Sequence, residues 1–279
     1  MTSDVCDSAP TVITPSSADE HVLVSDKHHS LVLGSTPEHV LAAQRLRATV
    51  FGSEAGYEST AFDGGLDADR FDDHCDHLLV VDNRTGDRVG CYRMLTPDGA
   101  ERAGGYYTAT EFDISELRAH ELRTVEMGRA CVLEGHRSGS VLALMWSGIL
   151  RYIDLGGYDR VMGCVSVPMA LGDGEPDGAH VKGVYDLVEK RHRSEVRAYP
   201  RTPVRVDGVA LADMTAPSRT SVPALMRGYL RMGASICGEP AHDPDFGVAD
   251  FVTLLHMKDA NVRYLDRLRS AAATAESHA

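Results

Sequence analysis

The six residues Gly135-His136-Arg137-Ser138-Gly139-Ser140 place glycines, hydroxyl groups and one arginine between a predicted strand and a predicted helix. Backbone N–H groups at a helix N-terminus have no partner within the helix, and the helix dipole is positive there, so such a turn can bind an anion. Ser138 and Ser140 can donate hydroxyl hydrogen bonds, and Arg137 can pair with a phosphate. The sequence therefore indicates a phosphate site, with an ordinary strand-to-helix turn as the alternative.

The predicted strand before this turn carries a carboxylate and an arginine. Alternation along a strand puts Glu126, Gly128 and Ala130 on one face, which suggests that something narrow packs beside a carboxylate and nearly bare backbone. The alternative is a structural glutamate at a strand edge, paired with one of the many arginines. A regular strand sends Arg129 to the opposite face, so joint action of Glu126 and Arg129 requires a β-bulge.

The segment Phe62–Asp76 is strongly acidic, with a local charge of −5. Its charged residues are Asp63, Asp67, Asp69, Arg70, Asp72, Asp73 and Asp76. Carboxylates stabilise an ammonium group, so one interpretation is a site for a cationic substrate. A metal site built from Asp72, His74, Cys75 and His77 is a weaker interpretation, because these residues do not follow a recognised ligand spacing, and no metal is expected. The third interpretation is an acidic loop that is simply exposed to solvent.

The elements that position these residues follow from the spacing of apolar side chains. Helices are predicted at Pro37–Phe51, Val141–Leu155, His180–Arg191 and Ser221–Met232. Strands are predicted at His77–Asp82, Arg88–Leu95, Thr124–Val132, Arg160–Val167 and Ala249–Met257, the first two forming a hairpin around Asn83-Arg84-Thr85-Gly86. This order indicates a mixed α/β fold with a partly antiparallel sheet.

Composition excludes several classes of protein. The 279 residues carry 41 Asp and Glu against 28 Lys and Arg, a formal net charge of −13, which disfavours nucleic acid and anionic membrane surfaces as partners. No apolar run is long enough to span a bilayer, and the N-terminus lacks the features of a secretory signal. The six widely spaced cysteines fit reduced thiols in a cytoplasmic protein.

The chain is predicted to hold one domain between two tails. Residues 1–33 are rich in Ser, Thr, Pro and Asp and are expected to form a disordered lead-in. Residues 34–269 form the single domain, and 270–279 form a flexible tail.

An ordered series of motifs connects the chain to a known family. It comprises Gln44–Phe51, Asp69–Asp72, Cys75–Asp82, Thr85–Leu95, Glu126–Val132, Arg137–Ser140, Leu142–Trp146, Leu230–Ala234 and Asp245–Phe251. The series resembles the ornithine–acyl-carrier-protein N-acyltransferases that begin ornithine-lipid synthesis, relatives of the acyl-homoserine-lactone synthases in the GNAT superfamily. The resemblance covers Pro37 to Tyr264.

The resemblance implies a GNAT acyltransferase fold, with a mixed, mostly antiparallel central sheet flanked by helices. It implies transfer of a fatty acyl group, 3-hydroxylated or not, from a phosphopantetheine thioester to the amine of an amino acid such as ornithine. No cofactor is expected to be tightly bound. The implied partners are an acyl carrier protein and a small amino-acid acceptor, with possible peripheral contact to a membrane.

The resemblance also implies roles for individual residues. Glu126 and Arg129 would be catalytic, Glu126 as the proton acceptor, and a backbone N–H near Gly128–Cys131 would polarise the thioester carbonyl. The donor's phosphopantetheine would contact Cys131, Arg137, Ser138, Gly139 and Ser140. The acceptor pocket and its mobile covering helix would involve Arg47, Phe51, Asp69, Asp72 and Arg93.

Two other functions remain open at this stage: an acetyl-CoA-dependent GNAT acetyltransferase, and a non-catalytic module that binds acyl carrier proteins or lipids. Acyl carrier proteins are acidic, so an acidic enzyme requires a local basic surface. The segment Lys182–Arg205 has seven basic against three acidic residues, a local +4, and is a candidate dock, with a merely solvated face as the alternative.

Overall fold

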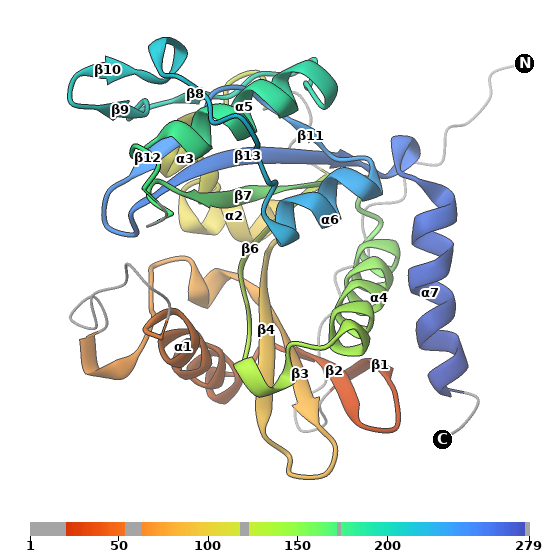
Figure 1. Cartoon of the computed structure of the whole chain (residues 1–279). Coiled ribbons are helices and arrows are strands. Elements are labelled where there is room, and N and C mark those ends of the chain that lie inside the picture. The colour runs from red at the N-terminus through yellow and green to blue at the C-terminus, as the bar shows by residue number, and fades with distance from the viewer. Residues whose placement is uncertain (1–20, 54–62, 118–122, 172–173, 277–279) are drawn as a thin grey trace, which may run out of the picture.

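The computed structural model describes residues 21–53, 63–117, 123–171 and 174–276. One nine-stranded sheet runs through the molecule in the order β1-β2-β3-β4-β6-β7-β13-β11, with β12 paired to β13 (Figure 1). Neighbouring strands are antiparallel except for β6 and β7. The mixed, mostly antiparallel α/β fold expected from the sequence is confirmed.

The strands of the main sheet are β1 (His21–Ser25), β2 (His29–Gly34), β3 (Asp76–Asp82), β4 (Arg88–Leu95), β6 (Thr124–Val132), β7 (Arg160–Pro168), β11 (Ser235–Ile236), β12 (Ala241–Asp243) and β13 (Val248–His256). Two small ladders pair β5 (Phe112–Asp113) with β8 (Tyr199–Pro200) and β9 (Arg205–Val206) with β10 (Val209–Ala210). The helices are α1 (Pro37–Phe51), α2 (Pro97–Ala103), α3 (Thr108–Glu111), α4 (Gly139–Gly156), α5 (Ala179–Arg191), α6 (Ala224–Met232) and α7 (Val262–Glu276).

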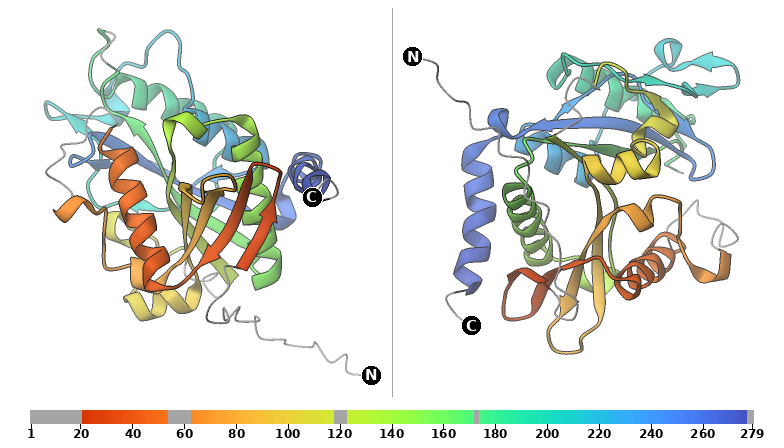
Figure 2. Two further views of the ribbon diagram at one scale, coloured as in Figure 1. Left: turned by 90° about the horizontal axis from the view of Figure 1, so that it is seen from below. Right: turned by 180° about the vertical axis from the view of Figure 1, so that it is seen from behind.

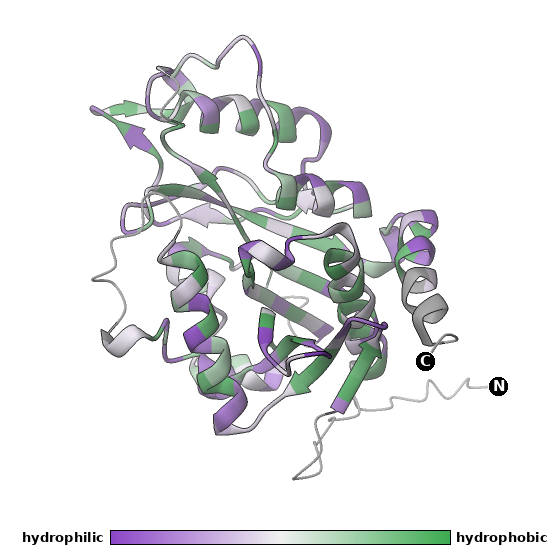
Figure 3. Ribbon diagram, turned by 60° about the horizontal axis from the view of Figure 1, so that its bottom comes forward, coloured by the Kyte–Doolittle hydropathy of each residue, from purple (hydrophilic) through white to green (hydrophobic). Residues whose placement is uncertain are grey.

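Helices cover both faces of the sheet, and α1 and α4 lie on opposite faces (Figure 2). Helix α1 begins where predicted, with the Thr36 side chain accepting from His39 N and Pro37 in the first turn. It packs Ala43, Leu46 and Val50 onto the sheet. Helix α4 is largely hydrophobic, as Figure 3 shows, and most of its side chains are therefore buried against the sheet and α7.

Two expected boundaries are wrong. Residues 21–33, assigned to the disordered lead-in, belong to the hairpin β1–β2, whose Leu23, Leu31 and Leu33 are buried in the core. Burial of these apolar side chains stabilises the hairpin, although the segment that contains them is polar as a whole. At the other end, α7 continues through Glu276, in keeping with the high helix propensity of alanine. The remaining tail residues, 1–20 and 277–279, lie outside the described residues.

The centre of the sheet opens between β6 and β7. Their parallel ladder pairs Thr124 to Glu126 with Arg160 to Met162 and then ends, although both strands continue (Figure 1). Among the described residues, no helix is both long and apolar enough to cross a membrane.

Candidate functional site

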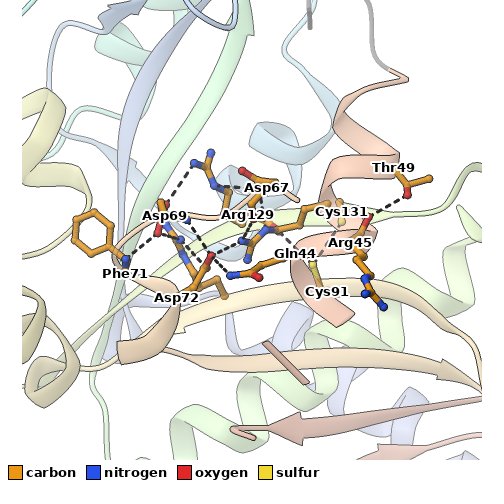
Figure 4. A network of polar contacts seen from close by, with 12 residues as sticks. Gln44, Arg45, Thr49, Asp67, Asp69, Phe71, Asp72, Cys91, Arg129 and Cys131 are labelled. Atoms are coloured by element: carbon orange, nitrogen blue, oxygen red, sulfur yellow. Dashed lines mark hydrogen bonds and ion pairs between the residues drawn. The ribbon is translucent and has the colours of Figure 1, made fainter. Parts of the chain in front are cut away.

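Three arginines and three aspartates form an ion-pair network beneath α1 (Figure 4). Arg47 Nη2 lies 2.7 Å from Asp72 Oδ2, and Arg47 Nε lies 2.8 Å from Asp67 Oδ2. Arg93 Nη1 lies 2.7 Å from Asp69 Oδ1 and 3.0 Å from Asp72 Oδ1. The structure therefore brings together Arg47, Asp69, Asp72 and Arg93 from α1, the acidic loop and β4.

Asp72 is the centre of this network. Its carboxylate also accepts from Gln44 Nε2 at 3.0 Å and from the backbone N–H of Asp69 at 3.2 Å. Burial opposes ionisation of Asp72, but the Arg47 and Arg93 guanidinium groups hold its pKa well below the usual range. Asp72 is thus a buried, charged organising group.

The four residues of the weaker metal interpretation do not act as a set. The Asp72 carboxylate is engaged by arginines, and His77 Nε2 lies 3.1 Å from the backbone oxygen of Asp72. Burial lowers the pKa of His77 to about 4, which keeps this imidazole neutral. These contacts make His77 part of the packing under α1.

Arg129 joins the network from β6 because the strand bulges. Cys91 pairs with Cys131 and Arg93 with Gly128, so Arg129 and Ala130 together face Tyr92. The Arg129 backbone is left-handed, with φ of 52°, an unusual conformation for this residue type. The bulge that joint action of Glu126 and Arg129 requires is present, and it turns the Arg129 side chain to within 3.5 Å of Asp67 and Asp69.

Glu126 is buried and holds the start of α3. One carboxylate oxygen accepts from Tyr107 N at 2.6 Å, and the other accepts from Thr108 N at 2.6 Å and from the Thr108 hydroxyl. Glu126 is 4% exposed, and burial raises its pKa although these hydrogen bonds oppose the shift. The carboxylate therefore sits in the floor of the site next to the opening between β6 and β7.

A second carboxylate group, missed by the sequence analysis, lies on the same side of the sheet. Single carboxylate oxygens of Glu111, Asp243 and Asp250 all lie within 4.8 Å of one another. Asp250 is 5% exposed and accepts from Ser166 Oγ at 2.6 Å, while Glu111 Oε2 is buried and has no hydrogen-bond partner among the residues that the structure describes. Burial and the neighbouring carboxylates raise the pKa of Glu111 and of Asp250. Asp243 and Asp250 come from the paired neighbouring strands β12 and β13, whereas Glu111 comes from α3, so sequence spacing does not connect Glu111 with the other two.

On the opposite face a small apolar hollow lies between the sheet, α4 and α6. It is lined by Met127, Trp146, Leu150, Ile153, Val161, Met162, Gly163, Tyr229, Ala234, Thr253 and Leu255. Met127 and Gly163 belong to the two strands that part at the opening. The hollow and the charged groups therefore lie on either side of one gap in the sheet.

The remaining predicted site residues lie along the edge of β6 and at the ends of two helices. Ser138 caps α4, accepting from Val141 N at 3.3 Å, and its hydroxyl lies 2.8 Å from that of Ser140. Arg137 Nε donates to Val132 O, and Gly139 begins the helix. Cys131 is buried beneath α1 with its sulfur 3.5 Å from that of Cys91, and Phe51 is the last residue of α1.

The basic segment Lys182–Arg205 lies away from the candidate phosphate turn. Figure 1 places α5 at the upper end of the molecule and the turn before α4 at the lower end, and the view from behind in Figure 2 agrees. Within the segment, Lys182 pairs with Asp186 and Arg197 pairs with Glu189. The sequence analysis predicted a dock for the acyl carrier protein on this segment and a phosphate site at the turn. Because the two lie at opposite ends of the molecule, a carrier protein docked on this segment would not lie next to the turn.

Comparison with known proteins defines the class. The family model described as "Acetyltransferase (GNAT) domain" matches residues 46–147. A CoA-dependent acyl-homoserine lactone synthase solved with SAM and isopentyl-CoA has the same fold, with a TM-score of 0.50 at 12% identity over 85% of this chain and 82% of that one. The protein is a GNAT-fold acyltransferase.

Sequence relatives narrow the class to a family. L-ornithine N(alpha)-acyltransferase of Brucella abortus is 33% identical over 249 residues, covering 84% of this chain and 86% of the relative. The enzyme of the same name from Rhizobium meliloti is 32% identical, covering 84% and 82%. The chain belongs to the L-ornithine N(alpha)-acyltransferase family.

Proposed function

We propose that this protein transfers a fatty acyl group from the phosphopantetheine thioester of an acyl carrier protein to the α-amine of ornithine. The observation that carries the proposal is the end of the β6–β7 ladder, which lies between a cluster of charged side chains on one face and an apolar hollow on the other. A thioester in this gap would present its carbonyl to an amine on the charged side. Its acyl chain would enter the hollow.

The donor arm would run along the open edge of β6 toward the turn at Arg137–Ser140, where the cap of α4 and Arg137 would bind its phosphate. A Cβ added at Gly128 would meet nothing within 4 Å, so there is room for a narrow group beside the bulge. Backbone N–H groups around Gly128–Cys131 would polarise the carbonyl. The acyl carrier protein would then approach from the end of the molecule that carries the turn.

The acceptor would lie among the charged side chains. Ornithine has one carboxylate and two ammonium groups, and the site offers both signs of charge. Arg129, 18% exposed, would bind the carboxylate, and Glu111, Asp243 and Asp250 would hold the side-chain ammonium. Arg47, Arg93 and Asp72 are buried in pairs with one another, so we assign them a positioning role for Asp69 and Arg129.

The reaction forms a C–N bond and breaks the C–S bond of the thioester. The attacking α-ammonium must first lose a proton, and Glu126 would accept it, directly or through water, because its raised pKa suits a base. The leaving thiolate takes up a proton when the tetrahedral intermediate collapses. Because the donor is an acyl carrier protein, we place the reaction in the cytoplasm.

The test uses purified protein, ornithine and two donors, a long-chain acyl carrier protein thioester and acetyl-CoA, with N-acylornithine measured by mass spectrometry. We expect transfer from the acyl carrier protein and little from acetyl-CoA. Transfer from acetyl-CoA alone would support the acetyltransferase alternative, and binding of the donor without transfer would support the non-catalytic one.

A second acceptor, matched to ornithine, tests separately whether the carboxylate group of Glu111, Asp243 and Asp250 binds the side-chain ammonium. L-norvaline has the size of ornithine without its side-chain amine. We expect Glu111→Gln to raise KM for ornithine while leaving KM for norvaline nearly unchanged. A similar change for both acceptors would contradict the assignment of the carboxylate group.

A further inference from the structure

Two histidines and an aspartate from three segments of the chain meet where β2 and β3 end. His29 is the first residue of β2 and lies opposite Asp82, the last residue of β3. Both side chains point to the α4 face of the sheet, because they continue the alternation of Leu31 and Val80, which are buried on that face. His136 reaches them from the short helical turn that precedes α4. The three side chains therefore form a set that no spacing in the sequence connects.

The three side chains are spaced like the ligands of one metal ion. A donor atom of each lies within 4.8 Å of the donor atoms of the other two. His29 Nε2 and His136 Nδ1 are 3.4 Å apart, and the two rings meet edge-on with their centroids 5.7 Å apart. This nitrogen–nitrogen distance is long for a hydrogen bond, but it matches the edge of about 3.3 Å in a tetrahedron whose nitrogens lie about 2.0–2.1 Å from zinc. One ion could bind both nitrogens with little movement of either ring.

The chemistry of the three groups selects a class of metal. Imidazole nitrogens bind zinc and its neighbours in the first transition row, and a carboxylate supplies negative charge for a divalent ion. Asp82 Oδ1 accepts from Arg84 N at 2.8 Å, and this hydrogen bond lowers the pKa of Asp82, so the carboxylate is charged at neutral pH. A carboxylate has enough lone pairs to accept this bond and to bind an ion as well.

A bound ion would connect parts of the fold that are not neighbours in the sheet. Strand β4 lies between β3 and β6, and the segment that carries His136 leads from the end of β6 to α4. Helix α4 then packs against β1, β2 and β3. An ion held by His29, Asp82 and His136 would therefore tie the start of α4 to the ends of β2 and β3.

We propose that His29, Asp82 and His136 bind one divalent transition-metal ion of the zinc class, which fastens the turn before α4 to the ends of β2 and β3. Three protein ligands leave a fourth position for water. The site goes beyond the proposed function and does not depend on it, since the groups assigned to the acceptor lie on the opposite face of the sheet. Because the ion binds only the folded arrangement of these side chains, binding stabilises the fold.

The experiment adds Zn²⁺ to the full chain, prepared without an affinity tag and freed of metal with a chelator. Calorimetry measures binding, and circular dichroism measures the melting temperature. We expect a rise in melting temperature of about 5 °C or more when free Zn²⁺ is about a hundred times Kd. His29→Ala and His136→Ala should each weaken binding about tenfold or more. His28→Ala, which removes an exposed histidine next to His29, should bind Zn²⁺ as the unmodified protein does.

A conservative variant keeps the inference testable if a histidine variant unfolds. Asp82→Asn can still accept from Arg84 N but lacks the negative charge, so it should fold without metal and bind Zn²⁺ more weakly. Co²⁺ gives a second readout, since its visible absorption changes with its ligands and should differ between His136→Ala and His28→Ala.

Unchanged Zn²⁺ affinity in His136→Ala and Asp82→Asn, or no rise in melting temperature with Zn²⁺, would overturn the inference. Neither result involves the formation of N-acylornithine, so either would leave the proposed function intact. Conversely, failure of the acyl-transfer assay would leave the metal site intact.

Discussion

Replacing Asp72 by Asn should destabilise the protein by about 3 kcal/mol at neutral pH. The Asp72 carboxylate accepts from Arg47, Arg93, Gln44 and the Asp69 backbone, and an amide can accept with one oxygen only. Removing one partner of a buried ion pair costs about 3–5 kcal/mol. The low end applies because Arg47 retains Asp67 and Arg93 retains Asp69.

The same substitution should change how stability depends on pH. The pKa of Asp72 is lowered in the folded protein, so its contribution is complete above the unfolded value near 3.9 and is lost as pH falls through the folded pKa. The stability difference between the unmodified protein and Asp72→Asn should therefore be constant from about pH 5 to 7 and narrow below about pH 4.

Urea unfolding followed by circular dichroism, with Asp73→Asn as the exposed neighbour control, measures both effects. We expect the control to change stability by less than about 0.5 kcal/mol. A difference below about 0.5 kcal/mol for Asp72→Asn, or one that widens in acid, would refute the assignment of Asp72 as the charged centre of the network.

Four other substitutions give distinct results. Gly163→Ala would place a Cβ 2.2 Å from Met127 O across the gap, so melting temperature and activity should both fall, whereas Gly128→Ala meets no protein atom within 4 Å and should raise KM for the donor without lowering the melting temperature. Glu126→Gln should reduce turnover and, because it disrupts the bonds to Tyr107 and Thr108, also lower the urea midpoint; unchanged turnover would remove Glu126 as the base. The raised pKa of Glu111 penalises the folded state as pH rises above about 4.3, so Glu111→Gln should become more stable relative to the unmodified protein between pH 5 and 8, and a pH-independent difference would contradict this.

Much of the fold could be predicted because local sequence signals agree with the final packing. Thr36-Pro37 marks the start of α1, and the Asn83–Gly86 turn marks the hairpin β3–β4. The hairpin β1–β2 was missed because Val22–Val24 and Leu31–Leu33 are short apolar runs within a polar segment. The strand β1 pairs with β2, and β2 pairs with residues of β3 that are 43 or more positions away along the chain.

The residues of the candidate site likewise fall into those that local sequence signals predict and those that depend on contacts between distant segments. Residues in one segment, such as Asp69 and Asp72, were found from local charge density, and the need for a bulge at Arg129 followed from strand alternation. Glu111, Asp243 and Asp250 were not found, because Asp243 and Asp250 come together only when β12 pairs with β13, and Glu111 lies in a distant segment of the chain. No periodicity rule connects positions more than a hundred residues apart.

The difference between predictable and unpredictable site residues has a physical cause, and that cause bears on which substrates are bound. The gap between β6 and β7 lies beside two features of the backbone, the bulge at Arg129 and the close approach of Gly163 to Met127. The proposed acceptor subsite instead depends on carboxylates that come from separate elements of the fold. Substitutions of these carboxylates would alter which amine is bound without disturbing the gap. We therefore expect substrate choice to vary among proteins of this fold at the positions that local sequence analysis detects least well.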